Sequence, residues 1–398
     1  MEKESYIKIT FTGDIYVTMS EISAHKTQNG NYDFSSIFEN CKNYFSASDY
    51  VVGNLETPVA NAKYCDEPYS FNSPIEFANA IKKAGVSMVT TANNHCLDRG
   101  VSGLEDTIMN LERVGLKHTG TNNGNKIPTG IVENFGDMNI GFLSYTYGTN
   151  AHVNKCYLNK NEKWKVNLYQ EQELHNPFVR CFYYSKFRQF TIDKTNKLSR
   201  FFLRKNIICP VPVHERSEQN TRLFKRMKDD IFAMKKGGSN YLIMCLHAGG
   251  QRNLAPIKST QKIAKRIAKM GVDAIIINHE HVIHYGEMLF EKAIVYSLGN
   301  FCPPCYSHLS DGYSILFNIY LSKENQIVKH IKTTFSIVKT VSDDENRVKA
   351  VLLFDLIKNC TNADELNELL ADNLKVYNLF RNSNETGIEL NLEYPCCA

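Results

Sequence analysis

Hydrophobic and polar positions follow two alternating rhythms over most of the chain. Short β-branched runs of the kind found in strands are followed by longer stretches in which apolar residues recur every three to four positions. This order continues to about residue 150, and it resumes from about residue 217 to about residue 340. Regular alternation of strand and helix is typical of βαβ units, so the pattern predicts an α/β fold with a largely parallel or mixed sheet.

Three predicted helices carry clear start and stop signals. The first has a serine N-cap, a proline at the first helical position and a capping-box glutamate at residues 73–76, and a glycine ends it at residue 85. The second is predicted from about residue 102 to 115, and the third from about residue 259 to 271. Each helix leads from one strand-like run to the next.

The rhythm breaks between about residues 152 and 216, where aromatic and basic side chains interleave. We interpret this segment as an insertion in the main domain. One reading is a partly helical cap whose aromatic side chains pack on the core. The other is a lid that offers cations to an anionic substrate, because residues 155–205 hold twelve basic against four acidic side chains, Arg180, Lys186 and Arg188 among them.

The domain boundaries follow from the same pattern. A main domain is predicted over residues 1–340, interrupted by the insertion, and a helical C-terminal extension over residues 341–398. Helices are predicted within that extension at residues 344–359 and 363–379. We find no internal repeat.

Composition narrows the class of protein without identifying it. A chain of 398 residues with 43% hydrophobic and 22% charged residues is typical of a folded protein of enzyme size. The net charge of +4 gives no reason to expect nucleic acid as a partner. No signal segment and no apolar run of about 18 residues is visible, so the sequence predicts a soluble, cytoplasmic protein without a transmembrane segment, whose cysteines are thiols.

The informative chemistry is a polar residue that closes an apolar, strand-like run, and this arrangement occurs six times, with His279 and His281 after one run and Asn300 after the last. In open α/β sheets the carboxyl ends of strands border one crevice, so such residues converge in space. Two carboxylates, an amide and three imidazoles suit two divalent ions such as Mn²⁺, Fe²⁺ or Zn²⁺. A bridging carboxylate would hold the ions roughly 3.5–4 Å apart, where they can activate a water. The six candidate metal ligands are Asp14, Glu56, Asn94, His247, His279 and His281.

His95 is predicted to act in catalysis and not as a ligand. It follows Asn94 and lies three residues before Asp98, which could raise the pKa of the imidazole and fix its tautomer. In that arrangement His95 would serve as a general acid or would hydrogen-bond an oxyanion. The alternative is a histidine at a helix start, with Asp98 as the N-cap residue.

Six stretches resemble the CapA family, bacterial proteins associated with poly-γ-glutamate capsule synthesis. The resemblance covers about residues 5–150 and 217–320, and the order and spacing of the stretches are highly specific. It implies a calcineurin-like metallophosphoesterase fold, a β-sandwich of mixed sheets flanked by helices, with the six candidates as metal ligands. The stretches are Thr12-Gly13-Asp14, Gly53-Asn54-Leu55-Glu56-Thr57-Pro58, Ala92-Asn93-Asn94-His95-Cys96-Leu97-Asp98-Arg99-Gly100, Leu246-His247-Ala248-Gly249, His279-Glu280-His281-Val282 and Tyr296-Ser297-Leu298-Gly299-Asn300-Phe301.

The chain departs from the family pattern at several positions. Ala248 and Gln251 stand where the family has a tryptophan and a glutamate, so an indole and a carboxylate are missing there. Glu280 stands where the family has a proline between the last two histidines. Tyr16 replaces a histidine that metallophosphoesterases generally carry, an absence that CapA proteins share. The membrane anchor common in the family is not visible either.

Together these observations predict a metal-dependent hydrolase. Its substrate would be an anionic polymer of the poly-γ-glutamate type or a phosphoester, with Glu56 bridging two metal ions and His95 protonating the leaving group. Capsule-synthesis proteins are expected partners. The alternative is a non-catalytic accessory subunit of capsule or cell-wall polymer synthesis, because a fold of this kind does not by itself decide the chemistry.

Overall fold

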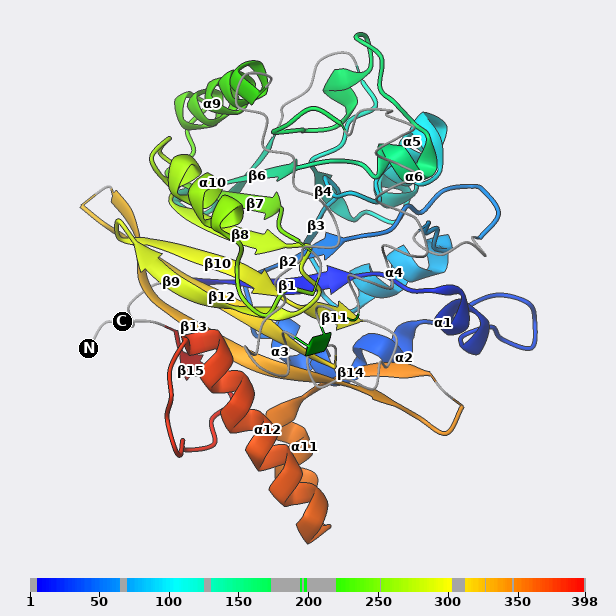
Figure 1. The fold of residues 1–398 in the computed structure, drawn as a ribbon, viewed down its shortest axis with the longest axis vertical. Coiled ribbons are helices and arrows are strands. Elements are labelled where there is room, and N and C mark those ends of the chain that lie inside the picture. The colour runs from blue at the N-terminus through cyan, green and yellow to red at the C-terminus, as the bar shows by residue number, and fades with distance from the viewer. Residues whose placement is uncertain are drawn as a thin grey trace.

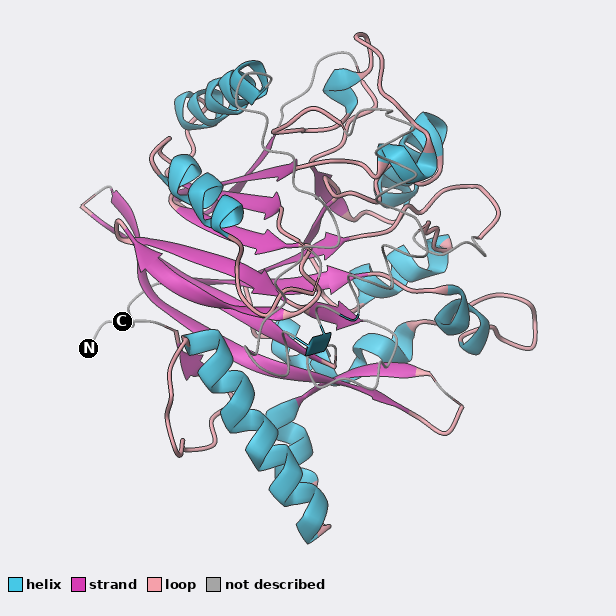
Figure 2. Cartoon of the chain, in the orientation of Figure 1, coloured by secondary structure: helices cyan, strands magenta, loops and turns pink. Residues whose placement is uncertain are grey.

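The computed structural model describes residues 6–64, 70–124, 130–172, 194, 197–198, 220–250, 252–302, 312–325, 327–345 and 347–396. In these ranges the chain forms two mixed β-sheets that pack on each other and are flanked by helices (Figure 1). Figure 2 separates the sheets from the helices around them. The predicted α/β architecture of mixed sheets flanked by helices is therefore confirmed.

The first sheet contains the N-terminal strands. Among the described residues it comprises β1 (Tyr6–Ile15), β2 (Tyr50–Leu55), β3 (Met88–Thr90), β4 (Lys117–Thr119), β11 (Asn300–Cys302), β12 (Tyr313–Glu324), β13 (Ile327–Ser342), β14 (Val348–Leu352) and β15 (Tyr394–Pro395). Its order is β14-β13-β12-β1-β2-β3-β4, with β11 beside β1 and β15 beside β13. Strands β1 to β4 run parallel, as the βαβ rhythm predicts, whereas β12 to β14 are antiparallel additions.

The second sheet contains β5 (Gly130–Phe135), β6 (Met138–Thr146), β7 (Tyr241–His247), β8 (Ala274–Asn278), β9 (Ile283–Leu289) and β10 (Lys292–Leu298). Within the described ranges the order is β5-β6-β7-β8-β10-β9. The four inner strands are parallel, and β5 and β9 close the edges as antiparallel partners of β6 and β10. The carboxyl ends of the inner strands therefore all lie at one end of the sheet.

Helices cover the outer faces of both sheets. The described helices are α1 (Met19–Ala24), α2 (Ser35–Phe38), α3 (Lys42–Ser46), α4 (Ile75–Lys83), α5 (Gly100–Arg113), α6 (Ala151–Asn154), α9 (Asn220–Lys236), α10 (Lys258–Ala268), α11 (Leu353–Asn359) and α12 (Ala363–Arg381), with 3₁₀ turns η1 (Glu39–Cys41) and η2 (Lys163–Lys165). Helices α1 to α4 pack on the first sheet, and α9 and α10 pack on the second. Of the helices in the described residues, none is both long and apolar enough to traverse a bilayer.

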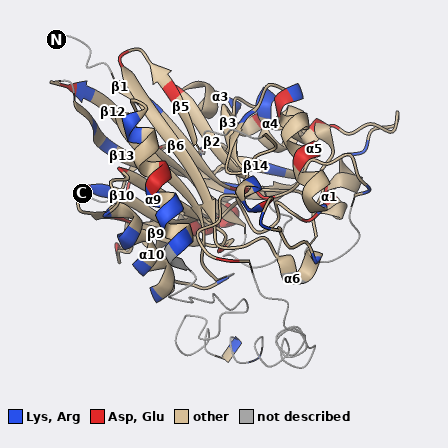
Figure 3. Ribbon diagram, turned by 90° about the horizontal axis from the view of Figure 1, so that it is seen from above, with Lys and Arg blue, Asp and Glu red and all other residues tan. Residues whose placement is uncertain are grey.

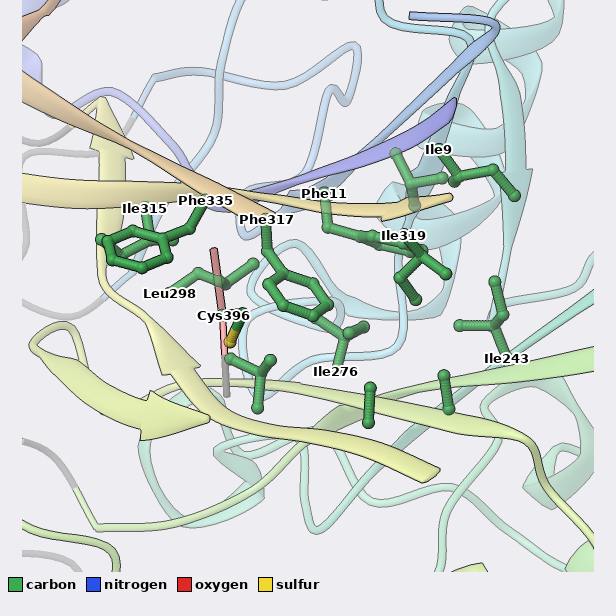
Figure 4. Close-up of a cluster of buried hydrophobic side chains, with 14 of the residues drawn as sticks. Ile9, Phe11, Ile243, Ile276, Leu298, Ile315, Phe317, Ile319, Phe335 and Cys396 are labelled. Atoms are coloured by element: carbon green, nitrogen blue, oxygen red, sulfur yellow. The ribbon is translucent and has the colours of Figure 1, made fainter. Parts of the chain in front are cut away.

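A layer of buried side chains holds the two sheets together (Figure 4). Phe11 and Phe317 reach into this layer from the first sheet, and Ile243, Ile276 and Leu298 reach into it from the second. Burying a side chain of this size contributes about 1.5–3 kcal/mol relative to leaving it in water. The layer therefore fixes the separation of the strands whose ends carry the candidate ligands.

Two predicted helix boundaries are wrong. The first helix has Pro74 and not Ser73 at its N-cap position, and the Ser73 hydroxyl lies 3.0 Å from that of Thr57 instead. The helix predicted at residues 344–359 begins only at Leu353, because Val348–Leu352 pairs with β13 as a strand. A short apolar run can form a strand or a helical turn. Here the run forms a strand because its backbone pairs with the edge of β13.

The domain division and the lid hypothesis both stay predictions. Residues beyond 340 add β14 and β15 to the first sheet, and the division into domains predicted there stays a prediction. Much of the predicted insertion lies outside the described residues, including Arg180, Lys186 and Arg188, so the lid hypothesis stays a prediction as well.

Gly13 offers a direct test of how the site is positioned. A Cβ atom at this residue would lie 2.0 Å from the carbonyl oxygen of Gly299, and backbone atoms cannot rotate away. We expect Gly13→Ala to lower the free energy of unfolding by about 2 kcal/mol or more, measured by urea denaturation. Gly387→Ala is the control, since no atom lies within 4 Å of the added Cβ there. Equal stability of the two variants would contradict the close approach.

Candidate metal centre

The ends of strands from both sheets meet at one place in the fold. The first sheet contributes side chains at or after the ends of β1, β2 and β3, and the second contributes them at or after the ends of β7 and β8. The structure thus brings together all six residues that the sequence predicts as ligands. In chain order they are Asp14, Glu56, Asn94, His247, His279 and His281.

Two groups of side chains in the described residues have the geometry of metal sites, and they share one residue. Glu56, His247 and His279 form the first group, and Asp14, Glu56 and His281 form the second, with the ligand atoms of each within 4.8 Å of one another. Oε1 of Glu56 lies 3.3 Å from Nε2 of His247 and 3.7 Å from Nε2 of His281. Glu56 therefore stands between the two groups, as a bridging carboxylate would.

The other distances around these groups are equally short. The Asn94 amide oxygen lies 2.7 Å from Nε2 of His247, and Nδ1 of His279 lies 3.0 Å from the same nitrogen. In the second group, Oδ2 of Asp14 lies 3.3 Å from Nδ1 of His281. Ligand atoms about 2.1 Å from one ion lie roughly 3 Å apart at the corners of an octahedron. The spacing therefore suits shared cations.

The hydrogen bonding of Glu56 bears on whether these residues suit metal ions. Its carboxyl group is fully buried, and among the described residues neither oxygen has a hydrogen-bond partner. The Nε2 atom of the buried His279 lacks a partner as well. Polar groups left buried without partners are costly, and buried carboxylates are normally paired or bound to metal. The donor set therefore fits divalent cations.

Two carboxyl groups of the site titrate in opposite directions. Burial disfavours the charged form of Asp14, but the hydrogen bond and charge of His281, with His247 and Asn54, outweigh it and hold the pKa below its ordinary value. Burial and the neighbouring charge of Asp14 raise the pKa of Glu56 well above its ordinary value. Without a cation, Asp14 therefore ionises at a lower pH than Glu56.

Burial favours the neutral form of two histidines, which is the form in which an imidazole binds a metal ion. Burial lowers the pKa of His247 to about 3 and lowers that of His279 well below its ordinary value, and neighbouring histidines add to both effects. The backbone at this corner is strained, since His279 has φ 117° and His281 has φ 60°. Positive φ is unfavourable for residues with a Cβ atom, and such strain is often kept at functional sites.

His95 and Asp98 form a buried pair beside the ligand groups. Nδ1 of His95 lies 2.7 Å from Oδ2 of Asp98, which also accepts a hydrogen bond of 2.7 Å from the backbone N–H of Phe71. The Phe71 ring packs on the imidazole with centroids 4.3 Å apart. The alternative prediction that Asp98 caps the following helix is wrong, because Arg99 occupies the N-cap position of α5.

Several residues at the site were not among the predicted ligands. Asn54 donates a hydrogen bond of 2.7 Å to Asp14, and the amide oxygen of Asn300 lies 2.8 Å from Nδ1 of His281. Both asparagines stand in strand-ending motifs, so the same signal could have found them. Tyr147, whose ring lies 4.8 Å from that of His279, and Phe71 come from segments without such a motif.

Glu280, one of the departures from the family pattern, contacts the loop that follows β7. Oε1 of Glu280 accepts a hydrogen bond of 2.9 Å from the backbone N–H of Gly250, and the Glu280 backbone oxygen accepts one of 2.8 Å from Arg252. These two partners flank position 251, where the family glutamate is replaced. A Cβ atom at Gly249, which has φ 129°, would lie 2.3 Å from the same Oε1. A carboxyl group is thus present at this loop, supplied by Glu280.

Comparison with known sequences identifies the family. A model of the family described as bacterial capsule synthesis protein PGA_cap matches residues 8–304. The chain belongs to this family. The predicted resemblance to CapA proteins is thereby confirmed, and the match includes all six candidate ligands.

Two relatives carry related names. The capsule biosynthesis protein CapA of Bacillus anthracis is 25% identical over 276 residues, which are 68% of this chain and 54% of that protein. The PGA biosynthesis protein CapA of Bacillus subtilis (strain 168) is 24% identical over 306 residues, which are 75% and 63% of the two chains. The chain therefore spans between half and two thirds of the length of these relatives.

Solved structures also resemble the chain. The calcineurin-like phosphoesterase YfkN from Bacillus subtilis has 13% sequence identity and a TM-score of 0.43, and the match covers 93% of this chain and all of that one. A phosphatase from Mycoplasma pneumoniae has 14% identity and a TM-score of 0.42, with 85% and 95% of the two chains covered.

The ligand assignment predicts distinct effects on metal content. We expect the purified protein to bind close to two divalent ions, as two-metal hydrolase sites do. Asp14→Ala and His281→Ala should each lower that number, whereas His95→Ala should leave it unchanged because its contact is with Asp98. Elemental analysis of the three variants beside the wild type measures this. Full metal content in both ligand variants would contradict the assignment.

The raised pKa of Glu56 predicts how the metal-free protein responds to pH. Once unfolded, Glu56 ionises at its ordinary pKa, so the free energy of unfolding falls as pH rises from that value towards the raised folded pKa. Glu56→Gln removes this loss and should stabilise the metal-free protein by roughly 1–3 kcal/mol at the upper end of that range. Urea denaturation in chelator across pH tests it. Parallel pH curves for the two proteins would contradict the burial of an ionisable, unpartnered carboxyl.

Proposed function

We propose that the chain is a metal-dependent hydrolase that acts on an anionic polymer of the poly-γ-glutamate type or on a phosphoester. The observation that carries this proposal is Glu56, which is fully buried and shared by two groups of ligands. In the part of the chain that the structure describes, neither of its oxygens has a hydrogen-bond partner. A purely structural carboxyl would be expected to have donors around it. A bridging role accounts for their absence.

Each of the two ligand groups would hold one divalent ion. His247 and His279 with Glu56 would hold one ion, and Asp14 and His281 with Glu56 would hold the other. When bound, such ions lower the pKa of water and stabilise negative charge that develops on the attacked group. Asn54 donates to Asp14 through its side-chain amide, so it keeps one carboxylate oxygen oriented and leaves the other for the cation.

His95 is suited to move a proton at its Nε2 atom. Asp98 occupies Nδ1 and Phe71 packs against the ring, so both the tautomer and the orientation of the imidazole are restrained. Asn94, its neighbour in the chain, lies 2.7 Å from Nε2 of His247, so His95 stands beside the ligand group. From there it can protonate a leaving group.

The proposed substrate class rests on the family and on the chemistry of the site. The name of the Bacillus subtilis relative, PGA biosynthesis protein CapA, favours poly-γ-glutamate. The two-metal ligand set suits a phosphoester equally well, because both reactions generate anionic transition states. Capsule-synthesis proteins are proposed as partners on the same family grounds.

A second candidate is a non-catalytic accessory subunit of capsule or cell-wall polymer synthesis. It is favoured by Gln251, which stands where the family pattern has a glutamate. In that case the ligand set would bind metal or polymer without turnover. The two candidates differ in one measurable property, which is hydrolysis by the metal-loaded protein.

The decisive experiment is a substrate panel on protein loaded with Mn²⁺, Fe²⁺ or Zn²⁺. We expect metal-dependent hydrolysis of a generic phosphodiester or of poly-γ-glutamate, and we expect His95→Ala to lower kcat by roughly 10²- to 10⁴-fold. KM and metal content should change little, since His95 is not a ligand. A control is Cys360→Ser, a change far along the chain from every ligand. Stable metal content without turnover on the whole panel would favour the accessory subunit.

A further inference from the structure

Helices α9 and α10 carry a cationic face on the outside of the second sheet. Lys and Arg colour much of both helices in Figure 3. Asp229 is the exposed acidic residue within them, whereas ten basic side chains from residues 220–236 and 258–269 are exposed. The basic residues are Arg222, Lys225, Lys228, Lys235, Lys236, Lys258, Lys262, Lys265, Arg266 and Lys269.

The basic residues form stripes and are not scattered. On α10 the positions 258, 262, 265, 266 and 269 recur at helical spacing, while the buried Ala264 and Ile267 face the sheet. The two helices are joined at this surface, because the guanidinium of Arg266 stacks over the Phe224 ring at 3.8 Å. The stripes therefore make one continuous surface.

Large apolar side chains stand within this cationic surface. Phe232 of α9 is 67% exposed and lies one turn before Lys235 and Lys236, so it shares their face. Phe290, in the turn between β9 and β10, is 57% exposed, and the ammonium of Lys269 lies 5.8 Å from its ring centroid. A basic surface that only contacted water would not be expected to expose two phenylalanine rings, because exposed apolar area is unfavourable in water.

Further contacts join the two phenylalanines into one region. Lys235 lies 3.6 Å from the carboxylate of Asp273, just after α10. Lys292, which opens β10, donates a hydrogen bond of 2.7 Å to the Ala268 backbone oxygen at the end of α10. The carboxyl ends of α9 and α10 and the β9–β10 turn thus meet, and the exposed Glu291 is the acidic residue in that turn.

This region lies away from the metal centre. Strand β10 begins at Lys292, beside the cationic surface, and it ends at Leu298, from which the chain leads to Asn300 against His281. Seven residues of extended strand span roughly 20 Å. The end of the surface that holds Phe232, Lys269 and Phe290 is therefore remote from the candidate site, and an anionic substrate in transit does not account for the exposed phenylalanines.

We propose that this surface, formed by α9, α10 and the β9–β10 turn, docks on an anionic phospholipid bilayer. Lysine and arginine side chains would contact the headgroups, and Phe232 and Phe290 would enter the interfacial layer. The phenylalanines favour a bilayer over a soluble polyanion, because a chain of carboxylates or phosphates offers them no apolar contact. The proposal does not depend on the activity proposed above.

Vesicle flotation with the full chain tests the proposal. We expect binding to phosphatidylcholine vesicles that contain phosphatidylglycerol, no binding to pure phosphatidylcholine, and release by salt. The double variant Lys265→Glu with Lys269→Glu should lower the partition coefficient by on the order of tenfold or more. Its control is Lys329→Glu with Lys375→Glu, which changes the net charge equally at exposed positions elsewhere and should bind like the wild type.

The aromatic residues need their own variant. Phe232→Ser should weaken vesicle binding, whereas Ile327→Ser, at a comparably exposed apolar position, should not. The proposal is overturned by any of three results: no binding to the anionic vesicles, equal loss in both double variants, or competition by soluble polyglutamate together with no effect of Phe232→Ser. Hydrolysis of a soluble substrate should be the same in all these variants, so failure here leaves the metal centre untouched.

Discussion

The close approach of two backbone segments at Gly13 and Gly299 is the constraint on which the site depends. The chain leaves the second sheet at the end of β10, turns at Gly299 with φ 74°, and enters the first sheet as β11 beside β1. The backbone N–H of Asp14 donates a hydrogen bond of 2.9 Å to the Gly299 oxygen at this crossing. Because a side chain on Gly13 would occupy the same space, glycine is required there. The crossing brings a carboxylate of one sheet against histidines that follow strands of the other.

The electrostatics of the site follow from that junction. The six candidate ligands meet in a volume from which water is largely excluded, so each side chain carries a desolvation cost that only partners can offset. Asp14 finds its partners in His281 and Asn54. Glu56 has no hydrogen-bond partner within the described ranges, and burial and the neighbouring Asp14 raise its pKa. Burial opposes the protonation of His247 and His279 at the same junction and lowers their pKa values. Two imidazoles that resist protonation beside two buried carboxyl groups form a site that divalent cations would stabilise.

The sequence predicts more of this arrangement than of its surroundings. All six strand-like runs that end in polar residues are strands, because a short β-branched run bounded by a turn signal is a strong local pattern. Local pattern does not state which sheet a strand joins, and β1 to β3 and β7 to β10 belong to different sheets. Nor could it find Phe71 beside His95, since that contact is made across a loop without periodicity. The strand at Val348–Leu352 was missed for a different reason: its partner β13 directly precedes it, but a short apolar run beside a helical pattern fits a strand and a helical turn equally well.

Glu280 shows how a departure from a motif is understood only with the fold. By position in the chain, Gln251 removes a carboxylate and Glu280 replaces a proline, and the two changes look unrelated. In the structure the Glu280 carboxyl lies against the loop that follows His247, bonded to the backbone N–H of Gly250 and within 3.4 Å of the Asn253 amide. Gly249 has φ 129° and no side chain, which leaves room for that carboxyl. The loop after β7 and the turn after β8 are thereby held together, and these are the two segments from which His247, His279 and His281 reach the site.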